Sequence, residues 1–367
     1  MKKVWCVKGT VTVLLALSAC SGVFAMSRRK SLDADAWEQE IGGVTITNSY
    51  ENSEELKKSF PVIYPTPVRG KLAKNIENRL LTGFANWNRG FDGWKAWGTV
   101  LYTDDSIYNV HGARLTLAEY QAAMDVALKQ ADIRMGDFQN ILICDDWAAI
   151  RYATSTIAPD GTETPGGVME FVKFKDYGRE LGTRVEEGWG GTRGAGFAAM
   201  SRFQTEAERE AQRQVDAGLL AYELPDTADL EKKYPVRYPT TDGSGYAKEI
   251  RRLLLEDFDS WNRGLADWKK NVDTLFAEDA QVSWGYSNAV SREGYKAVQE
   301  ELGGNGTLAK LYYDSMLISG DWAAIHFRVV YTDGESGVRT PGDIMQFYHF
   351  VEEDGALKVD MMWSSGR

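Results

Sequence analysis

The tetrapeptide "WNRG" occupies residues 87–90 and occurs again at residues 261–264. A phenylalanine precedes each tryptophan by three residues, and farther on "DDWAAI" at 145–150 corresponds to "GDWAAI" at 320–325. The two tetrapeptides lie 174 residues apart, and this offset changes by no more than two residues along the chain. A repeat of this length is too long for a solenoid, so it indicates a tandem duplication of a whole domain.

Each copy begins with a helical pattern and continues with strand-like segments. In the first copy Ile76, Leu80, Phe84 and Trp87 recur every three or four residues, which places them on one face of a helix. The glycine of each "WNRG" is positioned to end that helix in a left-handed conformation. The expected helices are 70–90, 93–103 and 116–130 in copy one, with 267–277 and 291–303 in copy two. The expected strands are 136–144, 146–157, 167–175 and 181–189, then 311–319, 321–331, 343–351 and 356–364. Helices followed by an antiparallel meander predict an α+β fold for each copy.

The N-terminus has the features of a bacterial export signal. A basic start is followed by the apolar run "VTVLLALSA" at 11–19, which is too short to span a bilayer. The run ends in "LSAC" at 17–20, which resembles a lipobox with Cys20 as the lipidated residue. Cleavage after Ala25 is the alternative. The first interpretation predicts an outer-membrane lipoprotein facing the periplasm, and the second predicts a soluble periplasmic protein.

These patterns divide the chain into five segments. Thr205 and Glu208 form a potential capping box at the start of a helix that ends near Leu224, so the segment between the copies is interpreted as a helical connector. The predicted boundaries are a signal peptide at 1–19, a polar tether at 20–56, the first domain at 57–190, the connector at 191–230 and the second domain at 231–367.

Composition limits the classes of function. A formal net charge of −11 disfavours a nucleic-acid partner, because phosphates would be repelled. The three histidines show no metal-ligand spacing, and no phosphate-binding loop or serine nucleophile motif is present, so no metal and no cofactor are expected. Cys144 lies in an apolar strand-like run and is interpreted as a buried free cysteine. The expected partners are a small-molecule ligand and, through a lipid anchor alone, the membrane.

The motifs of the second copy resemble a known family. The pattern comprises Trp261, Asn262, Gly264, Phe276, Asp279, the strand at 321–325, Gly355 and Trp363. It resembles the SnoaL-like branch of the nuclear transport factor 2 superfamily, as does the first copy. The resemblance implies two tandem cone-shaped domains, each with N-terminal helices packed in a curved antiparallel sheet around a pocket. It also implies that the copies pair through their sheets as an intramolecular pseudo-dimer, which would make the protein a monomer. The superfamily contains cyclases, ketosteroid isomerases, dehydratases and binding domains, so the fold does not select a function.

The cone interior is where functional groups are expected. Aromatic candidates for ligand contact are Trp87, Tyr102, Trp261, Phe276, Trp284 and Tyr348, with a place in the core as the alternative for each tryptophan on a helical stripe. Glu170 stands in the strand where cyclases of the family carry an acid, but copy two has Gln346 there. His111 is a further candidate and has no counterpart in copy two.

His326 and His349 are the remaining candidates for acid–base chemistry. If their strands pair as a hairpin about Gly337, the two histidines lie near each other on one face, with Arg151 and Lys173 at the matching positions of copy one. That face is either the cone interior, a solvated surface or the seam between the domains.

Three functions follow from these observations. The first is an exported tandem-domain protein that binds a small apolar or aromatic ligand in a cone pocket. The second is a cofactor-free isomerase, dehydratase or cyclase that works by general acid–base catalysis, which requires an acid and a base inside one cone. The third is a structural or partner-binding module of the cell envelope, which predicts filled cones.

Overall fold

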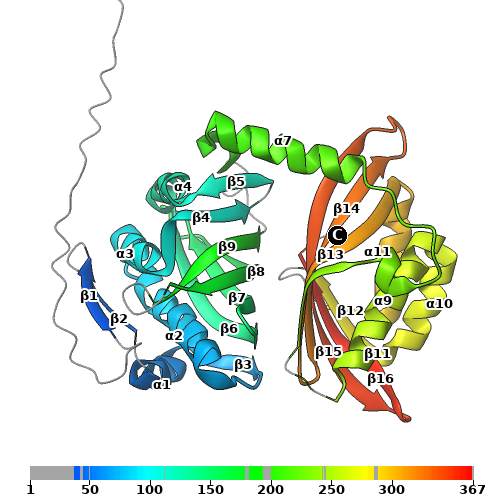
Figure 1. Cartoon of the computed structure of the whole chain (residues 1–367), viewed down its shortest axis with the longest axis horizontal. Helices are drawn as coiled ribbons and strands as arrows, with labels where there is room; N and C mark the ends of the chain where they lie inside the picture. Colours follow the sequence, from blue (N-terminus) through cyan, green and yellow to red (C-terminus); the bar gives the residue numbers. More distant parts are fainter. Residues whose placement is uncertain are drawn as a thin grey trace, which may run out of the picture.

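Two seven-stranded sheets, each with helices against one face, form the body of the protein (Figure 1). The computed structural model describes residues 37–41, 44–48, 50–110, 112–177, 182–192, 200–241, 243, 245–284 and 288–365. The α+β prediction is confirmed. Cys20 and His111 lie outside the described residues.

The two sheets have the same strand order. In domain 1 it is β3 (Val62–Pro65), β6 (Asp132–Cys144), β7 (Trp147–Ile157), β8 (Glu163–Asp176), β9 (Thr183–Thr192), β4 (Tyr102–Val110) and β5 (Ala113–Thr116). In domain 2 it is β10 (Val236–Thr241), β13 (Gly306–Ser319), β14 (Trp322–Asp333), β15 (Arg339–Glu353), β16 (Ala356–Ser364), β11 (Phe276–Trp284) and β12 (Val290–Ser291). The helices are α2 (Gly70–Trp87), α3 (Phe91–Leu101) and α4 (Leu117–Gln130), then α9 (Ala247–Arg263), α10 (Leu265–Leu275) and α11 (Arg292–Gly303).

Strands β4 and β11 were absent from the sequence prediction. Each follows its helix directly and pairs in parallel with the last strand of the meander, so the sheets are mixed rather than purely antiparallel. The register of β4 shifts between Tyr102 and Ile107, where the exposed Asp104 and Asp105 interrupt the alternation of buried and exposed residues. This interruption hides the period of two by which a strand is recognised.

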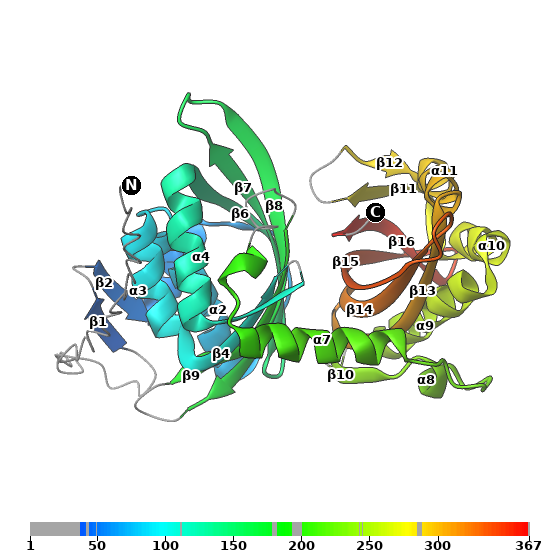
Figure 2. The ribbon, with the colours of Figure 1, turned by 90° about the horizontal axis from the view of Figure 1, so that it is seen from above.

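Each sheet has one face toward its own helices and one toward the other domain. Ile150, Val172 and their neighbours on the first face pack with α2, α3 and α4, and Ile325 and Tyr348 pack in the same way in domain 2. Figure 2 shows each sheet curving around its helices, with the two outer faces opposite each other.

The "WNRG" motif joins the first helix of each domain to the long strand beside it. The Trp87 indole Nε1 donates to the Ile133 carbonyl at 2.7 Å, and the Asn88 side chain bonds both backbone groups of Met135, at 2.9 and 3.0 Å. In domain 2 the same bonds run from Trp261 to Leu308 at 2.7 Å and between Asn262 and Lys310 at 2.7 and 3.0 Å.

The glycine that closes the motif has the predicted positive φ but not the ψ of a left-handed helical residue. Gly90 has φ 82° and ψ −166°, and Gly264 has φ 121° and ψ 163°, a conformation essentially reserved for glycine. Glycine reaches it without strain because it has no Cβ. The chain can therefore turn at once into the next helix, which begins at the following residue.

The outer faces of the two sheets meet in an aromatic interface. Tyr64 of domain 1 packs on Trp322 with ring centroids 5.1 Å apart, and Tyr238 of domain 2 packs on Trp147 at 5.0 Å. These residues correspond in the repeat, so the two contacts are reciprocal. The buried cluster continues through Leu142, Phe171, Leu317 and Phe347.

A second reciprocal contact pairs a basic side chain with a tryptophan. The Arg151 guanidinium lies 3.8 Å from the Trp363 ring, and at the corresponding positions His326 lies 5.9 Å from Trp189. The contacts between the domains therefore follow a pseudo-twofold relation.

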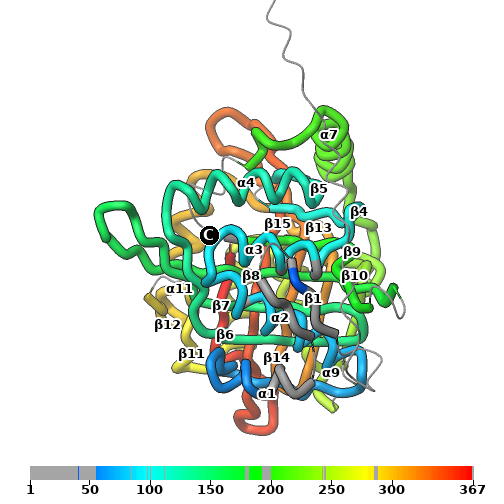
Figure 3. Tube along the Cα trace, turned by 90° about the vertical axis from the view of Figure 1, so that its left-hand side faces the viewer, coloured from blue at the N-terminus to red at the C-terminus, as the bar shows by residue number. Residues whose placement is uncertain are grey.

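Further elements precede domain 1 and connect the domains. The segment predicted as a polar tether contains a hairpin of β1 (Trp37–Ile41) and β2 (Val44–Asn48) and the helix α1 (Tyr50–Ser59). The connector contains a 3-10 turn, η1 (Met200–Phe203), α7 (Glu206–Leu220) and α8 (Leu230–Lys233). Figure 1 shows α7 crossing from domain 1 toward domain 2 along one edge of the molecule, and Figure 3 shows the same helix nearly end-on. None of the described helices has the length and apolar character needed to cross a bilayer.

The start of α7 departs from a complete capping box. The Thr205 hydroxyl accepts from the Glu208 N–H at 3.2 Å, as predicted. The Thr205 N–H, however, donates to Glu119 of α4 at 2.5 Å. Glu208 pairs with Arg114 instead. The first turn of α7 is therefore attached to domain 1.

We expect the two domains to remain associated after the connector is cut. A protease site inserted between Glu223 and Asp229 should yield two fragments that co-elute in gel filtration, because the buried interface holds them independently of the chain connection. The double variant Tyr64→Ala/Tyr238→Ala lacks both reciprocal ring contacts and should release the fragments more readily. Fragments of the otherwise unchanged protein that separate at micromolar concentration would contradict this arrangement.

Candidate ligand-binding site

The two cones differ in the space that they enclose. The cavity of domain 2 has a volume of about 510 Å³, whereas the corresponding cavity of domain 1 has about 20 Å³. Small-molecule sites commonly measure ~300–1,000 Å³. Domain 2 therefore has room for a ligand of that class, and domain 1 has room for little more than a water molecule.

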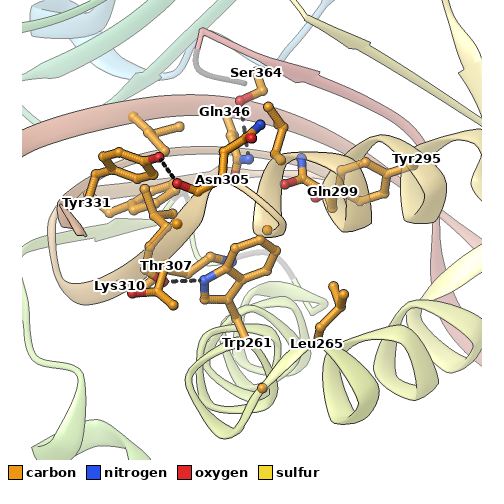
Figure 4. Close-up of a pocket in the computed structure, with 17 residues that line it drawn as sticks. Trp261, Leu265, Tyr295, Gln299, Asn305, Thr307, Lys310, Tyr331, Gln346 and Ser364 are labelled. Atoms are coloured by element: carbon orange, nitrogen blue, oxygen red, sulfur yellow. Dashed lines mark hydrogen bonds between the residues drawn. The ribbon is translucent and has the colours of Figure 1, made fainter. Parts of the chain in front are cut away.

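Helices and strands together form the walls of the larger cavity. Figure 4 shows Trp261 and Leu265, from the junction of α9 and α10, on one side. Gln346 of β15 and Ser364 of β16 lie on the opposite side. Apolar and aromatic walls with a few polar groups are typical of small-molecule pockets.

Larger side chains close the cone of domain 1. The N-caps Thr116 and Ser291 set the same register in α4 and α11, and the capped helices carry Tyr120 and Tyr295 at matching places. Domain 1 carries bulkier side chains at three positions, with Phe91, Met124 and Leu128 in place of Leu265, Gln299 and Gly303, and it carries the uncharged Met135 in place of Lys310. All four pack into the domain 1 core.

A buried ion pair adjoins the cavity of domain 2. Lys310 lines the cavity, and its Nζ donates to the Asp257 carboxylate at 2.8 Å, with both side chains less than a tenth exposed. The ammonium also faces the rings of Phe258, Trp261 and Phe327 at 4.9, 5.1 and 5.7 Å. Ring faces attract a cation at these distances.

The charge of Asp257 also affects a phenol in the cavity wall. Burial raises the pKa of Tyr295 well above its ordinary value, and the Asp257 carboxylate raises it further. Tyr295 therefore presents a neutral phenol to the cavity at physiological pH.

Domain 1 places its own polar group in the cone. Glu170 Oε1 accepts hydrogen bonds from the hydroxyls of Tyr108 and Tyr152, each at 2.8 Å. Burial of this carboxyl raises its pKa, although the two tyrosine hydrogen bonds act in the opposite direction. Glu170 thus stands in a cone that has no space for a ligand.

The corresponding position in domain 2 is an amide. Tyr348 donates to Gln346 Oε1 at 2.6 Å, and Gln346 Nε2 donates to the Ser364 hydroxyl at 3.3 Å. Because the carbonyl of Gln346 is occupied by Tyr348, the amide presents its NH₂ group on the side where Ser364 lines the cavity.

The aromatic candidates divide into three groups. Trp261 lines the larger cavity, and Trp87 and Tyr102 line the small one. Phe276, Trp284 and Tyr348 are buried in the core of domain 2. Sequence reasoning missed Asp257, Lys310, Tyr331 and Phe327. Aligning the two copies gives a signal for the ion pair, since Lys310 falls where copy one has Met135.

The predicted pairing of His326 with His349 is wrong. His326 lies opposite Met345, and His349 lies opposite Trp322, so the hairpin register differs by four residues from the predicted one. Both histidines are on the face that meets domain 1, as the contact of His326 with Trp189 shows. The turn is centred between Glu335 and Ser336, two residues before the predicted centre near Gly337, because the Asp333 N–H bonds the Val338 carbonyl.

The two histidines are held by carboxylates on that outer face. His326 Nε2 lies 2.8 Å from Asp343, and His349 Nδ1 lies 2.7 Å from Asp360. Burial lowers the pKa of His349, but Asp360 and Asp321 outweigh this effect and hold it above its ordinary value. Neither histidine is among the described residues of the cavity.

Other parts of the molecule offer weaker candidates for a ligand site. A cavity of about 230 Å³ lies between the domains beside α7, and its charged groups pair with one another: Arg328 with Asp314, and Arg114 with Glu187. Within the described ranges, no cluster of His, Cys, Asp and Glu side chains is suited to a metal ion.

Comparison with known proteins gives structural matches only. No family model matches the sequence. No curated protein matches it either. Among solved structures, AclR, a putative hydroxylase from Streptomyces galilaeus, matches with 24% identity and a TM-score of 0.28, covering 32% of this chain and 87% of its own. A putative SnoaL-like polyketide cyclase from Jannaschia sp. matches with 18% identity and a TM-score of 0.28, covering 34% and 88%. A ketosteroid isomerase-like protein from Erwinia carotovora atroseptica matches with 14% identity and a TM-score of 0.27, covering 33% and 95%.

We expect Glu170→Gln to be more stable than the parent, by a margin that grows as the pH rises. The pKa of Glu170 is higher in the folded protein than in the unfolded chain, where it is about 4.3. The protonated acid therefore contributes its full stability at pH values below the unfolded-state pKa, and this contribution is lost as the pH rises through the folded-state pKa. Glutamine keeps the oxygen acceptor for both tyrosines and cannot ionise. At about pH 8 the melting temperature of the Glu170→Gln protein should exceed that of the parent by a few degrees, at roughly 4 °C per kcal/mol. Near pH 4 the two melting temperatures should be nearly equal.

The matched control for this measurement is Glu163→Gln, an exposed carboxylate on the same strand. It should leave the pH profile unchanged. A Glu170→Gln protein that is less stable than the parent throughout this pH range would show that the carboxylate itself is required.

Proposed function

We propose that the protein binds a small apolar or aromatic ligand in the cavity of domain 2, while domain 1 is a scaffold with a filled cone. The observation that carries the proposal is the difference between about 510 and about 20 Å³ in two cones of the same topology. If the fold itself required an open interior, both domains would contain a large cavity. The open cone is therefore a property of the domain 2 side chains.

We further propose that both domains are SnoaL-like members of the nuclear transport factor 2 superfamily, arranged as a monomeric pseudo-dimer. The shared strand order and the repeated helix-end motif support this assignment. The reciprocal contacts between the outer sheet faces support the pairing of the domains.

The two alternative functions fit less well. Acid–base catalysis requires an acid and a base that both reach the ligand. Among the described residues, Glu170 lies in the closed cone, and Asp257 bonds Lys310 without lining the cavity. A purely structural or partner-binding role predicts filled cones, which domain 1 has and domain 2 does not. Ligand binding by domain 2 accounts for both observations.

Filling the cavity with the side chains of domain 1 should abolish binding without unfolding the protein. Gln299→Met combined with Gly303→Leu introduces the residues found at Met124 and Leu128. A Cβ at Gly303 would meet no atom within 4 Å, so the added side chain can enter the cavity without a backbone clash. We expect the affinity for a naphthalene-type fluorescent probe to fall at least tenfold, or about 1.4 kcal/mol.

The control for the filling experiment is Glu301→Met, which adds a methionine to the exposed side of the same helix. It should bind the probe as the parent does. Unchanged binding in the filled variant, with a melting temperature equal to the parent's, would place the binding site outside this cavity.

We also propose that the mature protein is attached to the membrane through Cys20, as an exported envelope lipoprotein. The "LSAC" sequence after a short apolar run supports this, and multiple acyl chains hold a protein durably at a bilayer. Metabolic labelling with a radioactive fatty acid should mark the parent protein and leave Cys20→Ala unlabelled. Equal labelling of both proteins, or of neither, would favour cleavage after Ala25.

A further inference from the structure

The cavity of domain 2 contains an indication of the charge of its ligand. Among the described residues that line it, Lys310 is the one with a formal charge at neutral pH. The other polar groups are amides, hydroxyls and phenols, such as Gln299, Gln346, Thr307 and Tyr331. The recognition of charge in this cavity therefore depends on Lys310 and its partner.

Lys310 is already neutralised before a ligand binds. Its Nζ donates to Asp257 Oδ2 at 2.8 Å, and the same carboxylate group receives a weaker bond from Asn271 at 3.4 Å. An ammonium has three N–H donors and no acceptor. Asp257 engages one of them, so a donor stays available for a ligand while the net charge of the pair is zero.

The position of Lys310 is fixed by its backbone. Asn262 bonds both the N–H and the C=O of Lys310, at the place where the register of β13 shifts relative to β14. The side chain then lies against Trp261 and Phe327, which also line the cavity. The donor is therefore held in place before binding, which lowers the entropic cost of binding.

The fold itself does not need this ion pair. In domain 1 the same two positions carry Met135 and Gly83, and Asn88 bonds the backbone of Met135 in the same manner. A buried ion pair is often no more stabilising than apolar residues of similar volume, because both charges must lose their hydration. The pair in domain 2 therefore has a role that the architecture leaves unexplained.

We propose that the Lys310–Asp257 pair selects an uncharged ligand with an acceptor oxygen and rejects carboxylates. The oxygen accepts a hydrogen bond from Lys310 Nζ, and the apolar body of the ligand lies against Trp261, Phe327 and Ile344. A carboxylate would bring a second negative charge beside Asp257, which is less than a tenth exposed, and this is unfavourable. This inference rests on the proposed function of the cavity and specifies the class of its ligand.

Three compounds of nearly equal shape test this selection: methyl naphthyl ketone, isopropenylnaphthalene and naphthoate. They differ at one substituent, which is a carbonyl, a hydrocarbon or a carboxylate. Equilibrium dialysis against the full chain should rank the ketone first. We expect the ketone to bind at least tenfold more tightly than the hydrocarbon, since a hydrogen bond to a charged donor contributes about that factor. Naphthoate should bind more weakly than the ketone.

The variant for this test removes both charges together. Lys310→Met alone would leave Asp257 buried without a counter-ion, so we combine it with Asp257→Ala, which approximates the Met135–Gly83 pair of domain 1. Alanine is chosen because glycine destabilises a helix interior. The double variant should bind the ketone no better than the hydrocarbon.

The outcomes separate this inference from the proposed function. Equal binding of ketone and hydrocarbon by the parent, strongest binding of naphthoate, or an undiminished ketone preference in the double variant would each overturn the inference and leave ligand binding intact. Binding of none of the three compounds by the parent would overturn both. If the double variant does not fold, Lys310→Arg keeps the charge and a donor and should retain the order of the three affinities. A Lys310→Arg protein that loses this order while still binding the hydrocarbon would again overturn the inference.

Discussion

The asparagine of the repeated motif is the contact on which each domain depends. A long antiparallel strand that bends around helices needs a bulge, and a bulge leaves backbone groups without a partner in the sheet. At Met135 and Lys310 the side-chain amides of Asn88 and Asn262 bond both of these groups. The end of the first helix is thereby attached to the strand at the point where the sheet bends. The tryptophan beside each asparagine adds its indole N–H to the same strand.

This attachment explains why the motif is retained while the cone interiors differ. The asparagine recognises backbone atoms only, so the side chain at the bulge is free to change. Domain 1 places Met135 there and packs it into the core, whereas domain 2 places Lys310 there and pairs it with Asp257. The two cones also exchange polar groups at a second position, since Glu170 corresponds to Gln346. One architecture thus supports a closed interior with an acid and an open interior with an ion pair.

Much of the fold could be predicted from the sequence, and particular residues show why the rest could not. The helical stripe through Ile76, Leu80 and Trp87 and the alternation in the meander strands give clear periods. Strand β4 gives none, because Asp104 and Asp105 occupy a bulge. The pairing of His326 failed for a related reason: the sequence does not show where the turn between β14 and β15 is centred, and the register depends on that position.

The candidate site was harder to predict because it depends on small differences of volume. An aromatic residue in a cone has the same sequence signal whether it lines a cavity, as Trp261 does, or fills the core, as Phe276 does. What distinguishes the two domains is the combination of Leu265, Gln299 and Gly303 against Phe91, Met124 and Leu128. These differences become visible only when the two copies are aligned residue by residue, with the capped starts of α4 and α11 fixing the register.

The two faces of each sheet also constrain charge differently. On the outer face both copies carry a basic group beside a tryptophan of the other domain, Arg151 at Trp363 and His326 at Trp189. A reciprocal interface needs matching groups on both sides, so the basic character is shared by the copies. The inner face has no partner that must match, and there the charges of the copies differ completely. A basic group on the outer face is therefore matched in the other copy, whereas a charge inside one cone needs no counterpart in the other. His326 is accordingly matched by Arg151 in the interface, whereas Lys310 in the wall of the domain 2 cavity and its partner Asp257 have no charged counterpart in domain 1.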